Sequence, residues 1–247
     1  MKPTKQRYRP LYNEGTCKQL KGKIGIVFFY LNDRESQWTQ NDIESMKPYL
    51  QEMQDFIANA AKQYQTYAQF TALHIHTNQQ QNPLSYPYIV CPYSDINQQQ
   101  GAFDVLHCIS ISLGYQSVQN MHQDMQQRTG CQQVAYQIIL NKAGRAYALI
   151  TDETQEYTEH AIIFRKSAKS GQIRNAGIYA HEFLHLFGAE DLYHTKYRKA
   201  HAALYHNDVM YTTRSDIQHT TISNITAYSL GWHNNLPEIL KAKRWWQ

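Results

Sequence analysis

Apolar residues along this chain occur either in short continuous runs or at helical spacing. Residues 23–32 are rich in β-branched and aromatic side chains, which is typical of a buried central strand. Between residues 38 and 67, apolar positions recur at intervals that place them on one face of a helix. Pro48 lies inside that stretch, so the helix is expected either to begin near Pro48 or to bend there.

The next part of the chain contains shorter elements. Residues 70–77 alternate between apolar and polar side chains, which predicts a half-buried strand. Residues 103–111 form an apolar run that predicts a further strand. Residues 115–128 have helical spacing and precede Gly130, a residue suited to end a helix.

The second half of the chain begins with two expected strands, residues 134–140 and 145–151, joined by a hairpin-like turn. Residues 160–165 predict one more strand, which we expect at the edge of the sheet. Such an edge can bind an extended peptide as an added strand. A buried helix is predicted over residues 173–187, and a short helix over 222–230 follows a loop-rich stretch.

This order of elements predicts an α+β fold with a mixed, twisted sheet and helices packed against it. Residues 1–22 are expected to form a basic N-terminal arm. Residues 23–247 are expected to form a single domain, because the sequence contains neither a repeat nor a clear linker. Its upper part would span residues 23–188, and residues 189–247 would form an irregular C-terminal subdomain.

Composition supports a folded protein and limits the classes of partner that we expect. Hydrophobic residues make up 42% of the 247 residues and charged residues 18%, which allows a normal core and argues against global disorder. The formal net charge is +4, with basic residues concentrated near both ends. Charge runs are usually solvated, and no nucleic-acid-binding motif accompanies them, so nucleic acid is not an expected partner.

The apolar runs bear on membrane insertion and cellular location, and the cysteines bear on metal binding. The longest apolar run, residues 24–31, is too short to cross a bilayer, so no membrane span is predicted. Residues 1–20 lack an apolar stretch of signal-peptide length, which predicts a cytoplasmic location and leaves export by a non-Sec route open. The four cysteines are widely spaced, so a cysteine-based zinc site is not expected.

The strongest chemical signal is the HExxH pattern of His181, Glu182 and His185. Two histidines four residues apart on a helix lie one turn above each other and can bind one metal ion. The carboxylate that follows the first histidine lies beside that ion, where it can accept a proton from a water molecule. The other residues of 183–187 are apolar, so the helix is buried, and three polar groups there are costly without a metal or partners.

A zinc site that performs catalysis needs three protein ligands and one open position. Gly188 can end the helix in a left-handed conformation and return the chain towards the ion. Asp191 would then supply a carboxylate oxygen as the third ligand. His194 is the competing candidate for this position, and Glu190 is a weaker one.

His181, Glu182, His185, Gly188 and Asp191 match the pattern HExxHxxGxxD place by place. This segment resembles the metzincin signature HExxHxxGxxH with aspartate in the last place. That variant resembles the snapalysin-type and immune-inhibitor-A-type zinc endopeptidases of bacteria. The resemblance covers roughly residues 173–232.

Metzincins also have a methionine in a tight turn beneath the metal, and the segment around Met210 resembles that turn. Some members have a tyrosine two places after this methionine, where the present chain has Thr212. Tyr211 comes one residue earlier and is a candidate either for stabilising the transition state or for packing.

The resemblance implies a metzincin-like fold and a zinc-dependent endopeptidase. Such an enzyme hydrolyses peptide bonds of a peptide or protein substrate with a metal-activated water, and Glu182 would be its general base. The alternative hypothesis is a structural or vestigial Zn²⁺ clamp in an interaction module, closed by a fourth ligand such as His194. The sequence predicts neither the oligomeric state nor the cleavage specificity, which depends on the walls of the cleft.

Overall fold

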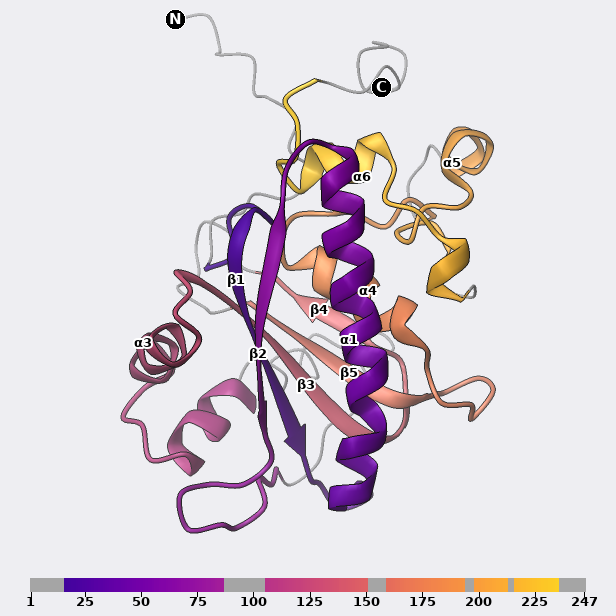
Figure 1. Cartoon of the computed structure of the whole chain (residues 1–247). Helices are drawn as coiled ribbons and strands as arrows, with labels where there is room; N and C mark the ends of the chain where they lie inside the picture. Colours follow the sequence, from indigo (N-terminus) through magenta and orange to yellow (C-terminus); the bar gives the residue numbers. More distant parts are fainter. Residues whose placement is uncertain (1–15, 87–104, 151–158, 194–197, 213–215, 236–247) are drawn as a thin grey trace, which may run out of the picture.

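The computed structural model describes residues 16–86, 105–150, 159–193, 198–212 and 216–235, and Figure 1 shows their arrangement. Five strands form one mixed sheet in the order β2-β1-β3-β5-β4. The strands are β1 (Gly22–Leu31), β2 (Ala68–Ile75), β3 (Gln133–Gly144), β4 (Tyr147–Leu149) and β5 (His160–Ser167). All neighbours pair in parallel except β4, which is antiparallel to β5. A mixed sheet with packed helices is the fold class that the sequence predicts.

Helix α1 (Gln40–Gln63) connects the parallel strands β1 and β2. Thr39 caps its first turn: its side chain accepts a hydrogen bond from the Asp42 backbone, and the Asp42 side chain accepts one from the Thr39 backbone. The helix therefore begins well before Pro48, which lies in its interior on the exposed side. Its buried stripe consists of Ile43, Met46, Leu50, Met53 and Ile57, together with nearby alanines.

The opposite face of the sheet is covered by α3 (Val118–Thr129) and by a helix at residues 105–112. Helix α3 ends at Gly130, whose φ of 67° is left-handed, as the sequence predicts. The prediction of a strand over residues 103–111 is wrong for the described part of this range, because residues 105–112 are helical. Val105, Leu106 and Ile109 are buried at helical spacing. A short apolar run of this kind is compatible with either a strand or a helix.

Two further strand predictions are corrected by the pairing. Residues 147–149 do not form a hairpin with β3, because β4 pairs with β5, with Tyr147 opposite Ile162 and Leu149 opposite His160. Strand β5 is not the edge strand, because it lies between β3 and β4. Its residues His160 to Arg165 are all buried, the pattern of a strand covered on both faces. The edge strand next to β5 is β4, and β2 forms the opposite edge of the sheet.

The alternating side chains of β1 divide the interior into two cores. Ile24, Ile26 and Phe28 face the side that carries α1 and α4 (Ala176–His185). Val27 and Phe29 face the side that carries α3. The metal-motif helix α4 therefore packs in the first core, where it contacts α1.

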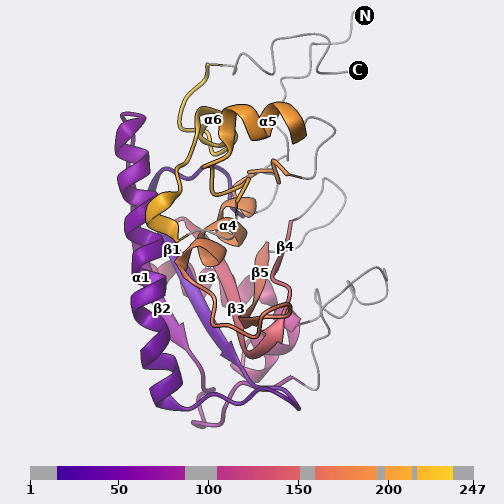
Figure 2. The same cartoon turned by 90° about the vertical axis from the view of Figure 1, so that its right-hand side faces the viewer.

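The C-terminal part of the structure contains α5 (Arg198–Tyr205), a 3-10 helix (Ile217–His219) and α6 (Asn224–Ser229). Figure 2 shows α5 and α6 together at one end of the molecule, beyond the end of the sheet where β1 begins. Leu20 joins this part to the sheet: its backbone N–H donates to Leu230 O at 3.1 Å, and its carbonyl accepts from Trp232 Nε1 at 2.7 Å. Residues 1–15 of the predicted arm lie outside the described residues, whereas Cys17 and Leu20 are fully buried.

Candidate metal centre

Helix α4 is buried from Ala176 to Leu184 and carries the two histidines, His181 within that stretch and His185 at its end. Asn175 caps the helix by accepting a hydrogen bond from the Gly177 backbone at 3.0 Å, and every residue from Ala176 to Leu184 is buried. His185 is only partly buried, and Gly188 follows with a left-handed φ of 93°. This residue reverses the chain after the helix, as the sequence predicts, and brings residues 189–193 back over the helix.

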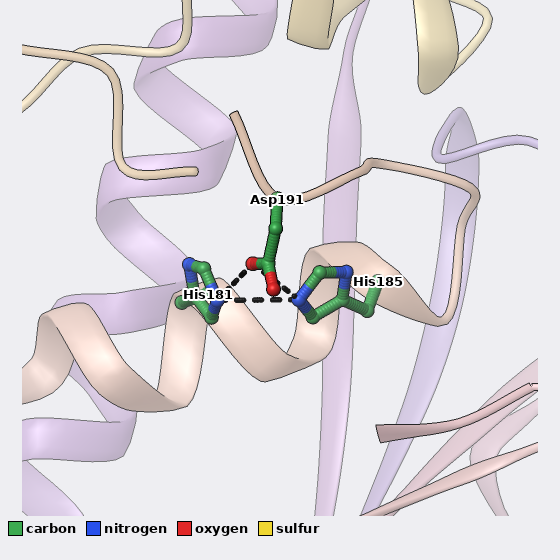
Figure 3. A group of neighbouring side chains, drawn as sticks. All are labelled: His181, His185 and Asp191. Atoms are coloured by element: carbon green, nitrogen blue, oxygen red, sulfur yellow. Dashed lines mark hydrogen bonds and ion pairs between the residues drawn. The ribbon is translucent and has the colours of Figure 1, made fainter. Parts of the chain in front are cut away.

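The reversal places the carboxylate of Asp191 between the two imidazole rings (Figure 3). Asp191 Oδ1 lies 3.0 Å from His181 Nε2 and 3.2 Å from His185 Nε2. The two Nε2 atoms are themselves 3.2 Å apart. These three side chains form a group that could hold a metal ion. Ligands at about 2.0–2.1 Å from a tetrahedral zinc ion are roughly 3.3 Å from one another, close to these separations.

Hydrogen bonds on the far side of each ring determine which nitrogens face the group. His181 Nδ1 lies 3.0 Å from Val209 O, and His185 Nδ1 lies 2.7 Å from Ala189 O. A carbonyl oxygen can only accept, so each Nδ1 carries a proton and each neutral ring has its lone pair on Nε2. Two lone pairs and one carboxylate oxygen therefore converge on one point, an arrangement that a cation bound there would stabilise.

The electrostatics of the three side chains are compatible with a bound cation. Burial alone would raise the pKa of Asp191, but contact with His181 and His185 lowers this pKa far below its ordinary value. Burial would lower the pKa of His181, yet Asp191 and Glu182 outweigh it and raise that pKa. Oδ1 of Asp191 is buried and has no hydrogen bond of regular geometry. The residues present thus fit a divalent ion with nitrogen and oxygen ligands.

Glu182 lies beside the group without belonging to it. Its side chain is buried, and burial raises the pKa of its carboxyl above the ordinary value, against the opposing effect of His181 and His185. A raised pKa brings a carboxylate closer to the range in which it can exchange a proton near neutral pH. This is the property expected of a general base.

A cleft of about 410 Å³ opens at the group. One wall is the edge strand β4 with its flanking residues, and the other is formed by α4 and the chain that follows it. The lining residues are Arg145–Ile150, His181, Glu182, His185, Glu190, Asp191 and Tyr193. Glu190 lines the cleft but is not part of the ligand group, and His194 lies outside the described residues.

Tyr193 is a cleft residue to which the sequence analysis assigned no role. Its ring stacks on His181 with centroids 6.1 Å apart, and burial and the neighbouring Asp191 raise the pKa of its hydroxyl. Its place two residues after Asp191 is the signal that could have identified it. Tyr211 packs instead against the hydrophobic core and is not among the described residues that line the cleft.

The predicted methionine turn lies next to the ligands. Met210 is fully buried, and the backbone N–H groups of Tyr211 and Thr212 both donate to Asp208 O at 2.9 Å. The carbonyl of Val209 accepts from His181, and the carbonyl of Met210 accepts from the Leu192 backbone at 3.0 Å. The turn therefore contacts His181 directly and Asp191 through Leu192, its neighbour in the chain.

Comparison with models of known protein families and with curated protein sequences gives no match for this chain. Within the described residues, none of the helices combines the length and apolar character needed to cross a bilayer. Evidence on function therefore comes from the geometry of the cleft and from the motif.

Proposed function

We propose that this protein is a zinc-dependent endopeptidase of metzincin-like architecture. The observation that carries the proposal is the convergence of His181, His185 and Asp191 on one point in an open cleft, with Glu182 buried beside them. The position of the Met210 turn against His181 also supports the metzincin-like assignment. The arrangement of the sheet and helices alone would not support an assignment of function, because one fold can carry many functions.

Each residue has a role that follows from its position. His181, His185 and Asp191 would hold the ion, with their orientation maintained by the Val209 and Ala189 carbonyls. When bound, zinc polarises a carbonyl and lowers the pKa of water to about 7. Glu182 would accept the proton of the attacking water and deliver it to the leaving amine, since it faces the same cleft as the ligands.

The edge strand favours an extended peptide as substrate. Strand β4 pairs with β5 on one side and is last in the sheet order, so no strand of the described residues pairs with its other edge. A peptide added along β4 would lie in the cleft, opposite the metal ligands. Within the described residues three side chains form the ligand group at this open cleft, which favours a peptidase over a structural zinc clamp, because structural sites are closed by four protein ligands.

The proposal is tested by metal analysis together with a cleavage assay. We expect the purified protein to bind stoichiometric zinc and to cleave an unstructured substrate such as a random peptide library. A chelator should stop cleavage, and added zinc should restore it. Stoichiometric zinc without turnover on any peptide would support the clamp instead, and failure to bind zinc would contradict both hypotheses.

Replacement of Tyr193 by phenylalanine tests which tyrosine assists the reaction. The Tyr193 hydroxyl is a phenol of the cleft whose ring stacks on His181, so we expect kcat to fall by about 100-fold if it stabilises developing negative charge. Tyr211→Phe is the matched control and should retain activity, because Tyr211 packs in the core. A larger loss for Tyr211→Phe than for Tyr193→Phe would reverse the assignment.

A further inference from the structure

A buried carboxylate lies behind the metal centre, away from the cleft. Asp208 is fully buried and does not line the cleft. Its Oδ1 accepts from the Met210 backbone N–H at 2.7 Å, and its Oδ2 accepts from the Ser223 backbone at 2.8 Å. Oδ2 also accepts from the hydroxyls of Ser223 and Thr226, the latter at 2.8 Å. Within the described residues no lysine, arginine or histidine forms an ion pair with Asp208, so hydrogen bonds compensate for its burial.

These four hydrogen bonds join two separate parts of the chain. Ser223 and Thr226 lie at the start of α6, whereas Met210 belongs to the turn under His181. The Val209 backbone N–H adds a further bond to Thr221 O at 2.9 Å. The turn is therefore held against α6 from one side and contacts the metal ligands from the other.

Two carbonyls of this turn reach the ligand group. Val209 O accepts from His181 Nδ1, which keeps the lone pair of that ring on Nε2. Met210 O accepts from the backbone N–H of Leu192, the residue after Asp191. A shift of the turn would therefore move or rotate two of the three ligands at once.

We propose that Asp208 is a positioning residue for the metal centre, through which the hydroxyls of α6 determine how tightly zinc is bound. The inference rests on the zinc site of the proposed function, but it does not depend on which substrate is cleaved. Loss of a hydrogen-bond partner behind a metal ligand typically lowers metal affinity by about 10- to 100-fold.

Asp208→Asn is the sharpest substitution, because it keeps the shape of the side chain. Each carboxylate oxygen of Asp208 accepts from a backbone N–H, one from Met210 and one from Ser223. Either orientation of the amide therefore turns an NH₂ group towards one of these donors. We expect the zinc dissociation constant, measured by competition with a chelator on folded protein, to rise about 10- to 100-fold.

Asp33→Asn is the matched control. Asp33 is also a buried carboxylate, which accepts from the Glu35 backbone at 2.9 Å and pairs with Lys142 at 2.5 Å. It follows the carboxyl end of β1, which points away from α6 in Figure 1. This variant should lower thermal stability and leave zinc affinity unchanged. If the role of Asp208 were purely structural, Asp208→Asn would likewise lower thermal stability and leave zinc affinity unchanged.

Thr226→Val provides a second variant if Asp208→Asn does not fold, because it removes a single hydroxyl at similar volume. It should weaken zinc binding in the same direction by a smaller factor. Unchanged zinc affinity in the folded variants would overturn the inference and leave the proposed function standing. Absence of zinc binding by the unmodified protein would overturn the proposed function and the inference together.

Discussion

Replacement of Glu182 by glutamine is expected to reduce peptide hydrolysis by about 1,000- to 10,000-fold while zinc remains bound. The amide keeps the size of the side chain but cannot take a proton, and general-base catalysis contributes up to about 10⁴-fold. Glu182 is outside the ligand group, so its loss should not release the metal. The measurement is kcat on a peptide substrate together with zinc content.

Glu190→Gln is the control for this prediction. Glu190 is a second acidic residue that lines the same cleft and lies outside the ligand group. It should keep most of the activity, which would show that the effect belongs to the position of Glu182 and not to the charge of the cleft. Wild-type turnover by the Glu182→Gln variant would rule out the proposed mechanism.

Replacement of Asp191 by alanine is expected to lower zinc affinity by about two to three orders of magnitude. Zinc sites with four protein ligands bind with roughly 10–16 kcal/mol, so one ligand contributes about 2.5–4 kcal/mol, and about 1.4 kcal/mol corresponds to tenfold. The variant also leaves two neighbouring imidazoles without the carboxylate that stabilises them. Titration of the metal-free protein with zinc measures the loss.

The same titration decides between Asp191 and His194 as third ligand. Asp191 lies within 3.2 Å of both histidines, whereas His194 lies outside the described residues. Near-wild-type affinity for Asp191→Ala, with a large loss for His194→Ala, would contradict the ligand set proposed above. Glu190→Ala, one residue away, is the control for a general disturbance of this loop and should bind zinc normally.

Local patterns predicted the parts of this structure that local physics determines. The spacing of His181 and His185 on a buried helix, and the reversal at Gly188, follow from helix geometry and from the backbone freedom of glycine. The central strand and the long helix around Pro48 were equally visible, because their apolar spacing extends over many residues.

Features that depend on distant partners could not be read from local pattern. A strand is an edge strand because of what lies beside it, so the edge was assigned to residues 160–165 instead of β4. The apolar run at 103–111 fits either a strand or a helix until its packing is known. The role of Asp208 was equally hidden, since its partners Ser223 and Thr226 lie 15 and 18 residues away.

The left-handed turn at Gly188 has a consequence for how such a site can be inherited. Because the chain reverses within a few residues of the helix, all three ligands and the glutamate come from the single segment 181–191. A lineage could therefore replace most of its sequence and keep this chemistry, provided that one apolar helix and one glycine survive. A short motif can then remain recognisable after most of the other residues of a chain have changed.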